Sequence, residues 1–64
     1  MRRNGIGKEI AAARKAAGLT QKAVADKLGM TVPGVGHWEQ GFREPSLETL
    51  AKLAKLLKTK FTVG

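Results

Sequence analysis

Apolar residues recur every three or four positions along most of this chain, which is the spacing of amphipathic helices. The pattern predicts four helices, at about residues 5–17, 21–28, 32–40 and 47–57. Each follows a residue that can cap a helix N-terminus: Asn4, Thr20, Thr31 and Ser46. A glycine follows each of the first three helices, where the left-handed backbone that ends a helix costs glycine little: Gly18, Gly29 and Gly41.

The apolar stripes of these helices define an expected core. They consist of Ile6, Ile10, Ala13, Ala17, Val24, Ala25, Leu28, Val35, Trp38, Leu47, Leu50, Leu53, Ala54 and Leu57. We therefore predict an all-α fold, a compact bundle of four to five helices in one domain at residues 1–58. The tail at residues 59–64 alternates weakly, and we interpret it as either a dimer contact or a disordered segment.

The helix predicted at 32–40 has two unlike faces. Val35 and Trp38 lie together on one side and are apolar and bulky enough to pack on the other helices. The opposite side is mixed and unsuited to a core: Val32, Pro33, Gly36, His37 and Gln40. Two glycines in so short a helix each cost about 1 kcal/mol relative to alanine. We expect Gly34 to contact another helix and Gly36 to allow close approach of a ligand.

The turn at Gly29 suggests what that ligand is. It joins two short helices so tightly that the second is suited to enter a DNA major groove. The chain has 64 residues with 12 Lys and Arg against 5 Asp and Glu, giving a net charge of +7. This charge favours a polyanionic partner, nucleic acid first and an anionic membrane surface second. A merely basic, solvated surface is the alternative reading of the charge alone.

Other function classes find little support in the sequence. One histidine, no cysteine and no paired carboxylates in a suitable context leave no nucleophile–base set and no metal-ligand cluster. No phosphate-binding or dinucleotide-binding glycine pattern is present. We predict no enzyme activity, no catalytic residues, no cofactor, no metal and no small-molecule substrate. No apolar run reaches the roughly 20 residues that span a membrane, and the lack of cysteine fits a reducing cytoplasm.

Residues 5–57 resemble the lambda-repressor-like helix-turn-helix domain of the Cro and phage-repressor family. The resemblance rests on Gln21, Ala25, Gly29, Val35, the run Trp38-Glu39-Gln40-Gly41, Arg43, the run Pro45-Ser46-Leu47 and the leucine-rich last helix. It implies a sequence-specific regulator of transcription, and a small phage or prophage Cro-like repressor is the form it most resembles. Such a protein would bind a pseudo-palindromic operator in double-stranded DNA as a homodimer, formed beforehand or only on DNA.

The resemblance also implies roles for single residues. Val32, Pro33 and His37 occupy the base-reading positions, although the first two can offer only apolar contact to a thymine methyl group. Gln21 and Arg43 occupy positions that contact phosphates. Thr31, Gln40 and Lys22 are further candidates for the DNA backbone, and Arg2, Arg3 and Lys8 are weaker ones. Arg14 and Glu39 are expected to form a structural ion pair, and Trp38 to belong to the core rather than to a stacking platform.

Two alternatives stay open at this stage. The same fold serves antitoxins and restriction-modification controllers, which the sequence does not distinguish from phage repressors. In a different class, a basic amphipathic protein can act at membranes or as a protein-interaction module. The turn at Gly29 and the inward pair Val35 and Trp38 argue against this second alternative, because a surface helix needs neither.

Overall fold

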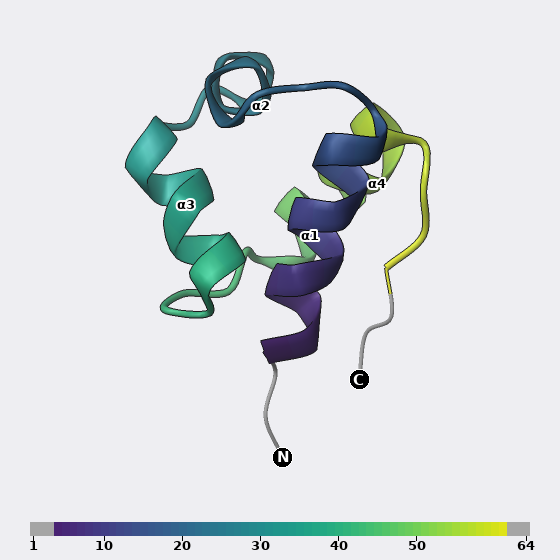
Figure 1. Ribbon diagram of the computed structural model, residues 1–64. Coiled ribbons are helices and arrows are strands. Elements are labelled where there is room, and N and C mark those ends of the chain that lie inside the picture. The colour runs from purple at the N-terminus through teal and green to yellow at the C-terminus, as the bar shows by residue number, and fades with distance from the viewer. Residues whose placement is uncertain (1–3, 62–64) are drawn as a thin grey trace.

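The computed structural model describes residues 4–61, with side chains from residue 6, and this part of the chain folds into four helices and no strand. They are α1 (Asn4–Ala16), α2 (Gln21–Leu28), α3 (Val32–Gln40) and α4 (Leu47–Leu57). Figure 1 shows α2 almost end-on while α3 runs across the view, so the two helices cross steeply around the tight turn between them. The predicted all-α bundle is confirmed.

Side-chain caps start three of the helices where the sequence predicts them. The hydroxyl of Thr20 accepts a hydrogen bond from the N–H of Ala23 at 3.0 Å. Thr31 and Ser46 accept in the same way from residues three positions later, at 3.1 and 3.2 Å. Each bond satisfies an N–H group that has no partner within the helix, which stabilises the helix by about 1 kcal/mol. The cap at Thr31 therefore fixes the residue at which α3 begins after the turn.

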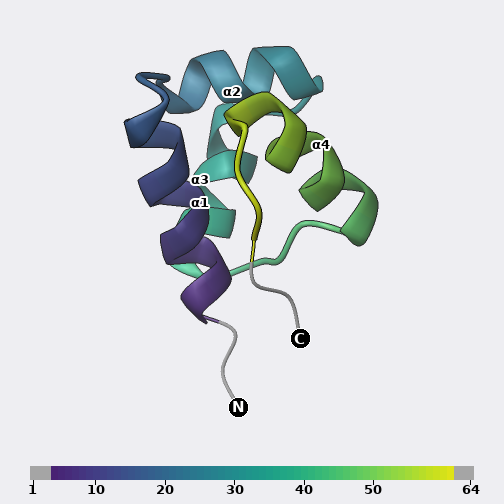
Figure 2. The ribbon, with the colours of Figure 1, turned by 90° about the vertical axis from the view of Figure 1, so that its right-hand side faces the viewer.

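The C-terminal ends of the helices follow the prediction with two differences. Gly18, Gly29 and Gly41 all adopt left-handed backbone, with φ of 74°, 69° and 86°. However, α1 begins at Asn4, which we expected to precede it, and ends at Ala16, one residue early. The last helix ends without glycine, because Lys58 itself takes φ 53°. From there the chain turns back, and residues 59–61 run along the face between α1 and α4 (Figure 2).

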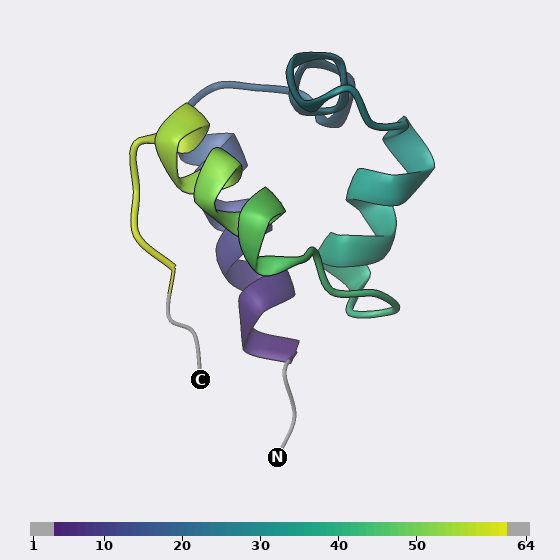
Figure 3. The same ribbon diagram turned by 180° about the vertical axis from the view of Figure 1, so that it is seen from behind.

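The core contains side chains from all four helices. Its buried members are Ile10, Val24, Ala25, Val35, Trp38, Leu50, Leu53 and Leu57. Two predicted members are wrong, because Ala17 is exposed and Leu47 is 73% exposed. Ala17 lies after the end of α1, where helical spacing no longer applies. Leu47 is the first residue of α4, where the helix has only just emerged from the loop that follows α3 (Figure 3).

One close contact between α1 and α3 escaped the sequence analysis. A Cβ atom added to Gly7 would lie 2.5 Å from the carbonyl oxygen of Trp38 and 2.9 Å from that of Glu39. Both atoms belong to backbone, so a larger residue would force the two helices apart, at a typical cost of about 1–3 kcal/mol. Glycine at this position thus lets α1 lie directly on the last turns of α3.

Candidate DNA-binding surface

An ion pair joins α1 to α3 next to this crossing. Nε of Arg14 donates to Oε2 of Glu39 at 2.7 Å, and Nη2 of Arg14 donates to Oε1 at 3.2 Å. The remaining guanidinium nitrogen, Nη1, donates to the carbonyl oxygen of Leu19 at 2.9 Å. The two charged side chains are only 12% and 8% exposed. Arg14 and Glu39 thus form the ion pair predicted from the sequence, in a two-pronged geometry that strengthens it.

Gln21 extends this ion pair to the second helix. Its Nε2 donates to Oε1 of Glu39 at 3.0 Å, so the carboxylate of α3 is hydrogen-bonded to side chains of both α1 and α2. We call Arg14, Gln21 and Glu39 the orienting cluster. The sequence analysis placed Gln21 at a phosphate-contacting position but missed its bond to Glu39. Since Nε2 carries two hydrogens, one remains available to a phosphate oxygen.

The two glycines of α3 have different surroundings. The atom nearest to an added Cβ at Gly34 would be the hydroxyl oxygen of Thr31, at 3.1 Å, and no other helix comes within 4 Å. The predicted helix contact at Gly34 is therefore wrong. A Cβ at Gly36 would lie 3.8 Å from Nε2 of Gln21. Gly36 thus lies beside the side chain of Gln21 at the junction of α2 and α3.

The remaining outward residues of α3 form one exposed side. Val35 and Trp38 are buried, at 0% and 5% exposed. Val32 is 40% exposed, and Pro33, His37 and Gln40 are also exposed. The structure therefore brings the three predicted base-reading residues together on a side of the helix that no other element in residues 4–61 covers. In Figures 1 and 3, α3 lies at one edge of the molecule, on the side opposite the segment after α4.

Phe42 adjoins this side and was not singled out in the sequence analysis. Its ring centroid lies 5.9 Å from that of His37, with the ring planes tilted by 58°. Its N–H donates to the carbonyl oxygen of His37 at 2.9 Å, and the N–H of Arg43 donates to the same oxygen at 3.3 Å. Phe42 is nevertheless 74% exposed. The sequence does contain a signal that could have identified Phe42, namely a large apolar residue next to the charged residues Arg43 and Glu44.

The charged candidates for phosphate contact differ in their surroundings. Arg43 and Lys8 are exposed. Lys22 forms an exposed ion pair with Asp26, 3.0 Å away on the next turn of α2, so part of its charge is already balanced. The hydroxyl of Thr31 accepts the capping bond described above, which leaves its O–H free to donate. Arg2 and Arg3 lie outside the described residues.

Two features are absent from the residues that the structure describes. No group of three or more His, Cys, Asp or Glu side chains is placed to hold a metal ion among residues that the structure describes. Within the same part of the chain, none of the helices combines the length and apolar character that crossing a membrane requires.

Comparison with known proteins places this geometry in context. Residues 10–63 match a protein family described as helix-turn-helix. The HTH-type transcriptional regulator ImmR of Bacillus subtilis is 36% identical over 61 residues, covering 92% of this chain and 48% of ImmR. The SPbeta prophage-derived uncharacterized HTH-type transcriptional regulator YonR of the same organism is 41% identical over 52 residues, covering 81% of this chain and 48% of YonR. The chain spans about half the length of these curated relatives.

A solved structure supports the same assignment of the fold. The crystal structure of the restriction-modification controller protein C.AhdI from Aeromonas hydrophila superimposes with a TM-score of 0.79 at 34% sequence identity. The match covers 88% of this chain and 85% of that chain. The arrangement of helices described above is therefore that of a helix-turn-helix bundle.

Proposed function

This chain belongs to the helix-turn-helix family, and on that premise we propose that it binds specific sites in double-stranded DNA and thereby regulates transcription. The observation that carries the proposal is the exposed side of α3, where Val32, Pro33 and His37 lie together on a rigidly held helix. A major groove admits one α-helix, and its floor carries the pattern that distinguishes the base pairs. The protein acts as a binding module, without catalytic chemistry of its own.

Residues at the ends of α2 and α3 would set the register on the DNA backbone. Gln21 keeps one amide hydrogen for a phosphate, and Thr31 keeps its hydroxyl hydrogen. We call the exposed side of α3, formed by Val32, Pro33, His37 and Gln40, the reading side. Arg43 follows directly after Phe42 and so lies just past its end, where it would contact the phosphates that border the groove. Gln40 and Lys22 are the more peripheral members of this set. Phosphate contacts of this kind orient a protein on the duplex but carry no sequence information.

Alanine substitution separates the two kinds of contact. Arg43→Ala should weaken binding to all DNA sequences alike and reduce the steepness with which affinity falls as salt rises, because one phosphate contact is lost. His37→Ala should instead change affinity at particular base pairs, by about 1–3 kcal/mol. Both side chains are exposed, so neither change should unfold the protein. Titration against a cognate site and its single-base variants at several salt concentrations measures both effects.

The reverse result would count against these assignments. If Arg43→Ala altered base preference while His37→Ala weakened all sequences equally, the roles of the two residues would have to be exchanged. An unaffected salt dependence in Arg43→Ala would remove it from the phosphate contacts.

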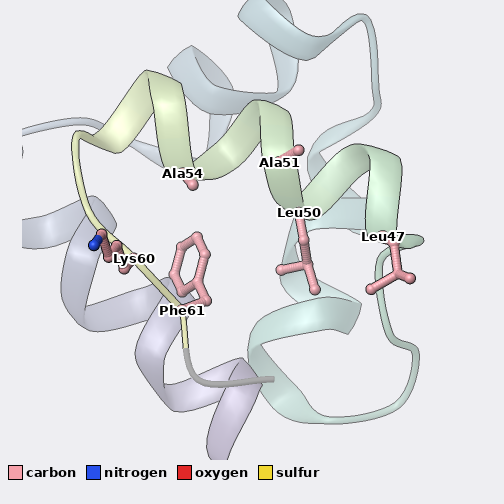
Figure 4. Close-up of a pocket in the computed structure, with 6 residues that line it drawn as sticks. All are labelled: Leu47, Leu50, Ala51, Ala54, Lys60 and Phe61. Carbon is pink, nitrogen blue, oxygen red and sulfur yellow. The ribbon is translucent and has the colours of Figure 1, made fainter. Parts of the chain in front are cut away.

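We place the homodimer contact on α4. A shallow groove between α4 and the segment after it is lined by Leu47, Leu50, Ala51, Ala54, Lys60 and Phe61 (Figure 4). Leu47 projects there with most of its surface uncovered, and a second copy would shield it. Val63, the other tail residue expected at the dimer contact, lies outside the described residues.

Sedimentation at micromolar concentration tests this contact. Without DNA we expect a concentration-dependent dimer that Leu47→Glu converts to monomer. A parent protein that sediments as a sharp monomer would remove the preformed dimer and leave pairing on DNA.

The regulated system is a narrower proposal with two forms. A phage or prophage repressor of the Cro-like kind is supported by the prophage origin in the name of YonR. A restriction-modification controller is favoured by the likeness to C.AhdI. In either form the protein acts where bacterial DNA lies, in the cytoplasm. The genes beside its own distinguish the two, since a controller accompanies a methyltransferase and an endonuclease, whereas a repressor lies among phage genes.

A further inference from the structure

We propose that this surface recognises the 5-methyl group of pyrimidines in the major groove, carried by thymine or by 5-methylcytosine, and that Phe42 is one of the residues that read it. The inference rests on the proposed function and specifies which chemical feature of the DNA the reading side detects. It adds a residue that lies outside α3 to that side.

The placement of exposed apolar side chains is the first observation. Four large hydrophobic residues are exposed in the described part of the chain, namely Met30 (42%), Val32 (40%), Phe42 (74%) and Leu47 (73%). Single exposed apolar residues are ordinary on a protein surface. Here, however, Val32 and the exposed Pro33 are the first two residues of α3, and Phe42 lies just past its last turn. Apolar groups therefore flank both ends of the proposed reading side.

The side chains of Pro33, His37 and Phe42 are close neighbours. Pro33 and His37 are four residues apart on α3, so they lie on the same side of the helix about 6 Å apart. The ring of Phe42 is the next neighbour, with its centroid 5.9 Å from that of His37. Pro33, His37 and Phe42 therefore follow one another as a row of neighbouring side chains. The two hydrogen bonds from the loop to the carbonyl oxygen of His37 hold Phe42 at its end.

The chemistry of the apolar side chains on this surface limits what they can detect. The side chains of Val32, Pro33 and Phe42 have no hydrogen-bond donor or acceptor, so they cannot pair with the polar edges of guanine or adenine. The apolar group that an unmodified base pair presents in the major groove is the C5-methyl group of thymine. Methylation of cytosine puts a methyl group on the same carbon. An apolar contact distinguishes methyl from hydrogen but is indifferent to the neighbouring oxygen or amino group, so both bases should be read.

Base analogues test the inference directly. In a site selected from random duplexes, each thymine of one half-site is replaced by deoxyuridine, which differs only by the missing methyl group. We expect one or more positions to lose affinity about 3- to 5-fold, as burial of one methyl group implies, while thymines outside the half-site show no change. At such a position cytosine should bind more weakly than thymine, and 5-methylcytosine should regain a similar 3- to 5-fold over cytosine.

Protein variants identify the residues responsible. The readout is the ratio of dissociation constants for uracil-containing and thymine-containing DNA, which a general loss of affinity does not move. Val32→Ala and Phe42→Ala should each bring this ratio close to 1 at a different base position. Lys52→Ala is the control, because it shortens an exposed side chain on α4, away from both the proposed reading side and the groove at Leu47, and should leave every ratio unchanged.

The failures of the two proposals can be told apart. A selected sequence whose complete uracil substitution changes affinity less than about 2-fold would overturn methyl recognition and leave sequence-specific binding intact, since a single buried methyl group already implies more than that. A ratio that persists in Phe42→Ala but vanishes in Val32→Ala would remove Phe42 from the surface. If no sequence is selected at all, the proposed function fails, and the inference fails with it.

Discussion

Replacing Glu39 with alanine should destabilise the protein by about 3 kcal/mol. The substitution leaves Arg14, whose side chain is 12% exposed, without its carboxylate, and a charge left unpaired in a nearly buried site is strongly destabilising. It also removes the acceptor of Gln21. Domains of this size have only modest total stability, so the melting temperature should fall by more than about 10 °C. Thermal and urea unfolding followed by circular dichroism measure the loss.

A second ion pair provides the control for this result. Lys22 and Asp26 pair across one turn of α2 with side chains 75% and 64% exposed. Lys22→Ala should therefore change stability by no more than about 0.5 kcal/mol. The double variant Arg14→Met, Glu39→Met should lose less than the sum of its single changes, because neither charge is left unpaired. An unfolding free energy for Glu39→Ala within about 1 kcal/mol of the parent would contradict the role of the orienting cluster.

Trp38→Ala should cost about 3–5 kcal/mol, the range for removing a large aromatic side chain from a core. Trp38 is 5% exposed and belongs, with Val35 and Leu53, to the cluster of buried residues shared by the four helices. At that cost most of the stability of a small domain is lost. Urea unfolding at low temperature, where some native protein remains, measures the difference from the parent.

The exposed phenyl ring of Phe42, just after α3, is the natural comparison. Phe42 is 74% exposed, so Phe42→Ala should alter stability by no more than about 0.5 kcal/mol while reducing DNA affinity. Trp38 would then belong to the scaffold and Phe42 to the binding surface. A stable Trp38→Ala protein that had lost affinity for single-stranded nucleic acid would instead indicate a stacking platform.

Features that depend on neighbouring residues were predictable from the sequence. A cap such as Thr31 acts on a residue three positions later, and the glycine at position 29 ends a helix through its own backbone. The inward position of Val35 and Trp38 follows from helical spacing. For the same reason the outward position of Val32, Pro33 and His37 needed no knowledge of the other helices.

Features that depend on how the helices meet were not predictable from helical spacing, and the ion pair of Arg14 with Glu39 was expected only from the family resemblance. The need for glycine at position 7 arises because backbone of α3 passes within contact distance, and helical spacing does not indicate which helix crosses there. The bond from Gln21 to Glu39 likewise joins residues 18 positions apart. Phe42 was missed because a loop has no period, and its position next to His37 depends on how residues 41–43 fold back onto the end of α3.

The central claim is that α3, held by the orienting cluster, reads specific base pairs in a major groove, and selection of binding sites from random duplex DNA tests it most directly. We predict enrichment of one short half-site, repeated with its two-fold mate about one helical turn, or roughly 10 base pairs, away. Affinity for the selected site should fall as salt rises. Recovery of no enriched sequence at any salt concentration, together with tight binding to anionic vesicles, would contradict the claim and favour a basic amphipathic protein that acts at membranes.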